Sequence, residues 1–110
     1  MNNLHLSAEA QADLEKIKEY ITVELENPAA AIAVIKRITK TIRILQQHAL
    51  AGAALSSIAN IESDYRFLVS GHYLIFYRVS ESDVYIDRVL YGRRDYLRIL
   101  FGESVEDEST

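Results

Sequence analysis

The sequence predicts an α+β fold: a short N-terminal strand, an α-helical hairpin, a three-stranded antiparallel meander (β-α-α-β-β-β), and a short C-terminal helix or tail. Two changes along the chain carry this prediction. Apolar residues recur at helical spacing through residues 8–51, and from residue 65 onward they follow a period of two. The last three strand-like segments are joined by two-residue links, which favour antiparallel neighbours.

The N-terminal strand and the first helix follow from local signals. Leu4 and Leu6 alternate with polar neighbours, which is typical of a short strand. Ser7 is suited to cap a helix, and we expect that helix over residues 8–25. Its apolar stripe consists of Ala10, Leu14, Ile17, Ile21 and Leu25.

A second helix begins after the Asn27-Pro28 turn, because proline suits the first turn of a helix. We expect it to end near Ala51, with Gly52 at its C-terminal cap. Residues 53–64 are expected to form a loop. The inner face of this helix carries Ile35, Ile38, Ile42 and Leu45, and Lys36, Lys40 and Arg43 fall on the opposite face. That basic face is typical of solvated helices, and phosphate contact is the alternative.

The meander is expected at residues 65–70, 73–80 and 83–91. With two-residue turns, both faces of this sheet are mainly apolar. The helical hairpin can cover one of them, so the other needs the segment after Gly92 or a partner chain. One predicted face carries Tyr65, Phe67, Val69, Leu74, Phe76, Arg78, Tyr85, Asp87, Val89 and Tyr91; the other carries Arg66, Leu68, Tyr73, Ile75, Tyr77, Val79, Val84, Ile86, Arg88 and Leu90.

Composition limits the protein class. The 110 residues predict one domain over residues 1–102, followed by an acidic tail at 103–110 that we expect to be disordered. The net charge of −4 comes from this tail, and residues 36–43 hold four cations and no acid. No apolar run is long enough for a membrane span, no signal peptide is evident, and cysteine is absent. These features favour a cytoplasmic protein.

Arginine and tyrosine are the residues left for chemistry. No phosphate-binding loop appears, and no carboxylate accompanies His5, His48 or His72 at metal-ligand spacing, so we expect no cofactor and no metal. The stretch VLYGRRDYLRIL, residues 89–100, places Arg93 and Arg94 directly after a predicted strand. Such a pair suits an anionic target or acidic residues of a partner. The candidates for acid–base or electrostatic work are Arg66, Arg78, Arg93, Arg94, Tyr91 and Tyr96.

Three segments together carry a family resemblance: SAEAQADLEKIKEYI, YRFLVSGHYLIFYRVSESDVYIDRVLYGRRD, and the apolar YLRIL. Over residues 4–100 the chain resembles the RelE/ParE superfamily of type II toxin–antitoxin toxins. RVLYGRRDY is the most specific element, being similar to the R-V-L-H-G-R-R-D usual in that superfamily. The RelE-like branch cleaves mRNA on the ribosome, and the ParE-like branch poisons DNA gyrase.

The ParE-like branch is favoured by this resemblance. In the ribonuclease motif Arg66, Arg94 and Tyr96 match, but Leu74 stands where an arginine is usual, and an apolar side chain cannot stabilise a developing phosphate charge. The expected function is therefore inhibition of DNA gyrase, and we expect the protein not to be an enzyme itself. The alternatives are a ribosome-dependent mRNA endoribonuclease and a non-toxic remnant that only binds its antitoxin. The expected target-binding residues are Tyr91, Arg93, Arg94, Asp95 and Tyr96.

The resemblance implies a cognate antitoxin that wraps the toxin as an extended strand and helix. An apolar sheet face without a cover gives this partner a physical reason to bind. A homodimer, or a heterotetramer with the antitoxin, is compatible with the resemblance. The expected antitoxin-binding residues are Phe67, Phe76, Tyr85, Val89, Leu97 and Leu100.

Overall fold

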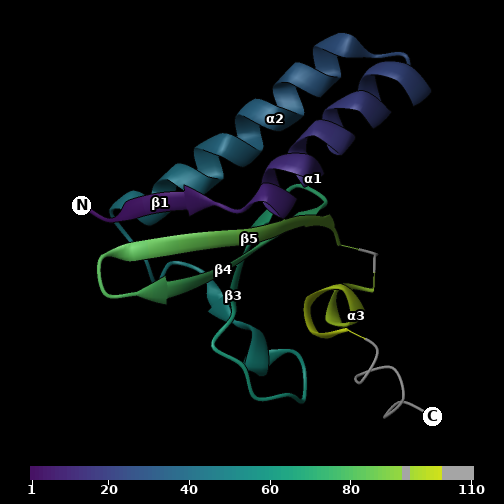
Figure 1. Ribbon diagram of the computed structural model, residues 1–110. Coiled ribbons are helices and arrows are strands. Elements are labelled where there is room, and N and C mark those ends of the chain that lie inside the picture. Colours follow the sequence, from purple (N-terminus) through teal and green to yellow (C-terminus); the bar gives the residue numbers. More distant parts are fainter. Residues whose placement is uncertain (93–94, 103–110) are drawn as a thin grey trace, which may run out of the picture.

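The computed structural model describes residues 1–92 and 95–102, and the predicted acidic tail lies outside them. Two helices cover one face of a five-stranded sheet, and a short C-terminal helix lies on the other face (Figure 1). The α+β prediction is confirmed. The strands are β1 (Asn3–Leu6), β2 (Ala53–Ala54), β3 (Arg66–Ser70), β4 (Tyr73–Ser80) and β5 (Asp83–Tyr91), and the helices are α1 (Ala8–Glu19), α2 (Pro28–Arg43) and α3 (Tyr96–Phe101).

The sheet has the strand order β1-β5-β4-β3-β2. The meander β3–β4–β5 is antiparallel, as predicted, with Ser70 paired to Tyr73 and Ser80 to Asp83 across the two turns. β1 lies parallel to β5, which joins the N-terminus to an edge of the meander. The segment predicted as a loop, residues 53–64, contributes the short strand β2 beside β3 and a 3₁₀ turn at Leu55–Ser57.

The first helix changes its winding before it ends. Ser7 caps α1 as predicted, since its Oγ accepts a hydrogen bond from the Ala10 amide at 2.9 Å. The predicted helix over residues 8–25 becomes a π-helical turn at Tyr20–Glu24, closed by the bond from Leu25 N to Tyr20 O. A wider turn rotates the following side chains away from the stripe. Ile21 therefore stays buried, whereas Leu25, predicted to face the core, is 55% exposed.

The second helix ends eight residues earlier than predicted. α2 stops at Arg43 and passes into a 3₁₀ turn at Ile44–Gln46, because the chain turns back to the sheet once Leu45 is buried. Gly52 is therefore no helix cap. Its amide donates to Tyr77 Oη at 2.9 Å, and a Cβ at this position would lie 2.4 Å from the Phe67 carbonyl oxygen. The position is closed to any side chain.

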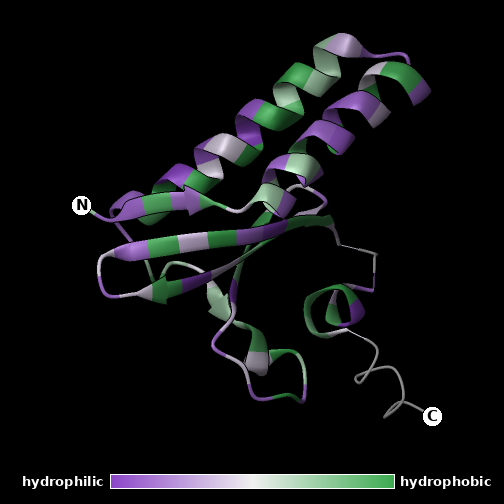
Figure 2. Ribbon diagram, viewed as in Figure 1, coloured by the Kyte–Doolittle hydropathy of each residue, from purple (hydrophilic) through white to green (hydrophobic). Residues whose placement is uncertain are grey.

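Two apolar clusters fill the two sides of the sheet. The helix-side cluster joins α1 and α2 to the sheet, and the opposite cluster is covered by α3 together with residues 55–61. Figure 2 shows the apolar residues of α3 and of the strands. The second face is thus covered by the chain itself, which is the first of the two predicted alternatives. Buried members are Ala10, Ile38, Ile42, Leu45, Ile75, Tyr77, Val84, Ile86 and Val89 on the helix side, and Leu55, Ala59, Phe76 and Leu90 on the other.

A bulge in β5 corrects the predicted faces. Tyr77 pairs with Ile86 but Phe76 pairs with Arg88, so Asp87 is an extra residue on β5. One inserted residue exchanges the faces of every residue beyond it. Val89 therefore lies on the helix side and Leu90 on the α3 side, the reverse of the prediction for both. Tyr91 likewise changes face and pairs with Tyr73.

No helix within residues 1–92 and 95–102 is long and apolar enough to cross a membrane.

We predict that Gly52→Ala destabilises the fold by about 2 kcal/mol, because the added methyl group overpacks a site bounded by backbone. Urea unfolding followed by circular dichroism measures this change. Ala51→Ser, on the exposed neighbouring residue, is the control and should leave the midpoint nearly unchanged. An unchanged midpoint for Gly52→Ala would contradict the close approach of the two backbones.

Candidate functional site

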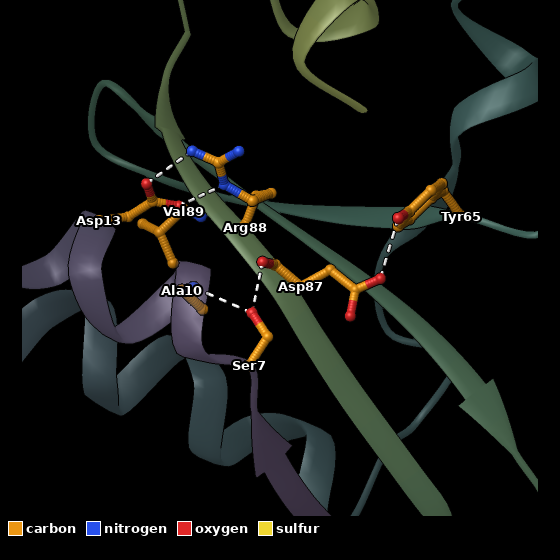
Figure 3. Close-up of polar contacts among 7 residues, drawn as sticks. All are labelled: Ser7, Ala10, Asp13, Tyr65, Asp87, Arg88 and Val89. Atoms are coloured by element: carbon orange, nitrogen blue, oxygen red, sulfur yellow. Dashed lines mark hydrogen bonds and ion pairs between the residues drawn. The ribbon is translucent and has the colours of Figure 1, made fainter. Parts of the chain in front are cut away.

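The β5 bulge lies where β1 stops pairing and α1 begins. The pairing of β1 with β5 ends at Leu6 and Ile86, so the outer edge of β5 beyond that point needs other hydrogen-bond partners. Ser7 supplies the first: its amide donates to Ile86 O, and its Oγ donates to Asp87 O at 2.7 Å (Figure 3). The residue that caps α1 thus also binds the bulge.

Asp13 supplies the second partner from the next turn of α1. Its carboxylate accepts two hydrogen bonds from the Arg88 guanidinium, both at 2.8 Å, and one from the Val89 amide at 2.9 Å (Figure 3). Asp13 is buried, with 6% exposure. The hydrogen bond to Asp13 raises the pKa of Arg88, so the guanidinium remains charged. This arrangement fixes α1 against the strand.

The bulge residue Asp87 forms a second ion pair, with Arg78. Asp87 accepts hydrogen bonds from Arg78 Nε and Tyr65 Oη, each at 2.9 Å, in keeping with the prediction that Arg78 and Asp87 share one face of the sheet. Burial and the hydrogen bond to Asp87 raise the pKa of Tyr65 to about 12. Between this group and α3 lies a polar cavity of about 320 Å³, lined by Ser7, Glu9, Tyr65, Asp87, Arg88, Ile99 and Leu100.

A larger and more apolar groove lies on the helix side, where α1 passes the ends of β4 and β5. The groove has a volume of about 470 Å³ and is lined by Asp13, Lys16, Ile17, Tyr20, Tyr73, Val89, Leu90 and Tyr91. We call it the tyrosine groove. Tyr73 and Tyr91 meet edge to face with ring centres 5.8 Å apart. Burial and the neighbouring phenols of Tyr91 and Tyr20 raise the pKa of Tyr73, so this phenol remains a neutral hydrogen-bond donor.

The groove has the composition of a protein-recognition surface. Tyrosines at its mouth offer large apolar faces with a hydroxyl at one end, and Tyr20 and Tyr91 are 55% and 39% exposed. Lys16 is the cation in its lining. Among the described residues, no group of three or more histidine and carboxylate side chains is placed to hold a metal ion.

The segment that follows β5 carries the predicted target-binding residues. Tyr91 ends the strand at the tyrosine groove, and the Gly92 amide donates to His72 O at 2.8 Å, which holds the chain to the β3–β4 turn. Arg93 and Arg94 lie outside the described residues. Asp95 caps α3, accepting from the Arg98 amide at 3.4 Å, and its other oxygen lies 3.7 Å from Arg98 Nε. Tyr91 and Asp95 thus flank the arginine pair.

Two of the residues matched to the ribonuclease motif lie on opposite faces of the sheet. Arg66 pairs with Tyr77 on the helix side, and its Nη2 donates to the carbonyls of Gly52 and Leu50 at 2.6 and 3.2 Å. Tyr96 stacks on Phe76 at 5.3 Å, on the α3 side. The two side chains therefore do not converge on one phosphate.

The residues predicted to bind an antitoxin differ in accessibility. Tyr85 is 38% exposed and stacks on His5 with ring centres 4.9 Å apart. Phe76 and Val89 are fully buried, in the α3-side and helix-side clusters respectively. Phe67, Leu97 and Leu100 are half-buried in the α3-side cluster.

The residues of α1 that complete the contact with the β5 bulge and the tyrosine groove were not predicted from the sequence. Asp13 lies beside the apolar stripe of its helix, and an acid next to a buried stripe is a signal that could have predicted a buried partner. Lys16 and Tyr20 had no comparable signal, because their place in the groove depends on how α1 crosses the sheet. Tyr73 reaches the groove as the cross-strand partner of Tyr91.

Comparisons with known proteins agree on one family. The family model described as the ParE toxin of type II toxin-antitoxin systems, parDE, matches residues 4–96. A solved structure of the chromosomal ParDE TA system from P. aeruginosa is similar to the chain with a TM-score of 0.70 and 26% identity, over 83% of this chain and 96% of that one. No curated protein matches the chain.

We predict that Asp13→Ala destabilises the fold by about 3 kcal/mol, because it leaves Arg88 and the Val89 amide without their partner. A quarter of the Arg88 side chain is exposed, which keeps the loss at the lower end of the range for broken buried pairs. Chemical unfolding measures it. Asp83→Ala removes an exposed partner of His5 and is the control with little expected effect. Equal effects of the two substitutions would refute the role of Asp13.

We predict that Tyr65 ionises near pH 12. Because its folded pKa lies above the unfolded value of 10.0, its contribution to stability is complete below pH 10 and is lost as pH rises toward 12. The difference between the ultraviolet titration curves of the wild type and of Tyr65→Phe isolates the ionisation of Tyr65. Asp87→Asn should lower the pKa, and a Tyr65 titration near 10 in the wild type would contradict the hydrogen bond.

Proposed function

Because the chain belongs to the ParE family of toxins of type II toxin–antitoxin systems, we propose that it inhibits DNA gyrase and is neutralised by a cognate antitoxin. Toxin identity rests on the family, whose model matches residues 4–96. The choice of gyrase rests on the geometry of this chain. We propose that the chain catalyses no reaction itself. We also propose that it acts in the cytoplasm, where gyrase works.

One observation carries the choice of gyrase over the ribosome. A ribonuclease needs its cationic and proton-transferring groups around a single phosphate. Here Arg66 is bound to backbone carbonyls on one face of the sheet, while Tyr96 is stacked on Phe76 on the other. Leu74 packs into the α3-side cluster where an arginine would be needed. The arrangement suits binding rather than cleavage.

We propose that the target contacts the mouth of the tyrosine groove and the segment after it. Tyr91 is half-exposed there, and Asp95 and Tyr96 begin α3 beyond the arginine pair. Arg93 and Arg94 complete the proposed contact, because guanidinium groups bind carboxylates in the bidentate manner that a protein target offers.

We propose that the antitoxin contacts Tyr85 and the half-buried residues Phe67, Leu97 and Leu100. The last three surround the α3-side cluster, where an apolar partner would extend a core that already exists. Phe76 and Val89 belong to the proposed contact only if α3 or α1 shifts, since both are buried. A heterotetramer, or a toxin homodimer, is the proposed assembly.

We predict that the purified chain blocks DNA supercoiling by gyrase and causes gyrase-dependent DNA breakage, and that it leaves ribosome-bound mRNA intact. Arg93→Ala/Arg94→Ala should weaken the inhibition about tenfold or more, as expected for lost charge-assisted hydrogen bonds. Lys18→Ala/Lys36→Ala makes the same change in net charge at exposed sites outside the tyrosine groove and is the matched control.

The opposite pattern decides between the alternatives. Cleaved mRNA with unaffected gyrase would replace the proposal with the ribonuclease, and Arg66, Arg94 and Tyr96 would become the catalytic candidates. Inactivity in both assays, together with tight antitoxin binding, would identify a non-toxic remnant.

A further inference from the structure

The outer face of α2 carries a row of cations that neither the core nor the tyrosine groove uses. Lys36, Arg37, Lys40 and Arg43 are all exposed. Their helix turns its opposite side inward, where Ile38 and other apolar residues are buried against the sheet. Figure 2 shows these hydrophilic bands along α2. We call these four residues the α2 basic row.

The row is unusual because its charges have no carboxylate partners. Within residues 1–92 and 95–102, no ion pair involves any of the four, whereas Arg78, Arg88 and Arg98 each have an acidic partner. The chain holds no acidic residue at all between Glu26 and Glu62, so α2 and the turns after it are purely basic. A protein with a net charge of −4 thus keeps one surface electropositive.

We propose that the α2 basic row binds the phosphate backbone of double-stranded DNA. Lys36 and Arg43 are seven helical steps apart, which is about 10.5 Å along the helix axis. One strand of B-DNA advances about 3.4 Å per phosphate, so the row spans about three phosphate spacings and matches about four consecutive phosphates. Arg37 extends the row toward the β3–β4 turn, where its Nη1 lies 3.6 Å from the position that a Cβ on Gly71 would take.

Duplex DNA fits this face better than other anionic partners do. Single-stranded nucleic acid is held by bases stacking on aromatic side chains, and α2 has none. A protein interface has an apolar centre and a polar rim. Here the order is reversed, because the cations occupy the centre and the exposed Ile32 and Ile44 lie at the two ends.

The proposed DNA binding does not depend on the base sequence of the DNA, and it is separate from the proposed inhibition of gyrase. No side chain of the row lines the tyrosine groove, so loss of DNA binding and loss of gyrase inhibition are separable. Contacts to phosphate alone carry no base information. The binding would hold the protein near DNA, with an affinity in the range of about 10⁻⁴ to 10⁻⁶ M that is usual for backbone contacts.

The test measures the fluorescence anisotropy of a labelled DNA duplex of about 25 base pairs, which is longer than one binding site. The protein is the 110-residue chain, made by cell-free synthesis. Binding is followed from about 50 to 200 mM salt, and four phosphate contacts predict a slope of about −3 to −4 for log K against log salt. Lys36→Gln/Lys40→Gln should make the slope shallower by about 2. Lys16→Gln/Lys18→Gln changes the same residue types on α1 and should leave it unaltered.

Three results would overturn the proposal: no binding to the duplex, equal effects of the two double variants, or tighter binding to single-stranded DNA or duplex RNA. An acidic peptide bound in place of DNA, with affinity lost in both Lys36→Gln/Lys40→Gln and Ile32→Ala/Ile44→Ala, would instead assign the face to a protein partner. Retained gyrase inhibition in Lys36→Gln/Lys40→Gln would show that the two surfaces act separately.

Discussion

The carboxylate of Asp13 holds the first helix, α1, to the C-terminal part of β5. It is a single side chain from the first helix that replaces a missing strand neighbour for β5, through the Val89 amide, and also neutralises Arg88. The contact occurs where β1 has ended and the sheet edge would otherwise be open. Because Ser7 binds the same bulge one turn earlier, the direction of α1 is set by two hydrogen-bonded points on β5. The tyrosine groove exists because α1 follows that direction.

The bulge at Asp87 explains why the sheet can serve two cores. Without the inserted residue, Val89 and Leu90 would each point to the opposite side, and the helix-side core would lose a residue that α1 packs against. With it, Asp87 lies half-buried beside Arg78 and Tyr65, while the strand end supplies Tyr91 to the groove. A local irregularity thus separates a structural half of β5 from a half available for recognition.

Much of this fold could be predicted from the sequence, because the signals were local. The Ser7 cap and the two tight turns were predicted from residues that neighbour one another in the chain, and the shared face of Arg78 and Asp87 followed from the turns. The failures were non-local. The end of α2 depends on the turn that buries Leu45 against the sheet, and the faces of Val89 and Leu90 depend on a bulge that leaves no mark in the alternation. The groove was missed because it requires the crossing of α1 over a strand about 75 residues further along the chain.

The parallel pairing of β1 with β5 has a consequence for how the protein is made. Asn3 pairs with Asp83, so β1 gains its neighbour only after a further 80 residues have been synthesised. Until then the meander is incomplete, and Asp13 has neither Arg88 nor Val89 to bind. Contacts between such distant residues form late in folding, because a long loop must close first. The nascent chain therefore has no tyrosine groove until β5 has been synthesised, and the recognition surface arises only when Tyr91 can pair with Tyr73.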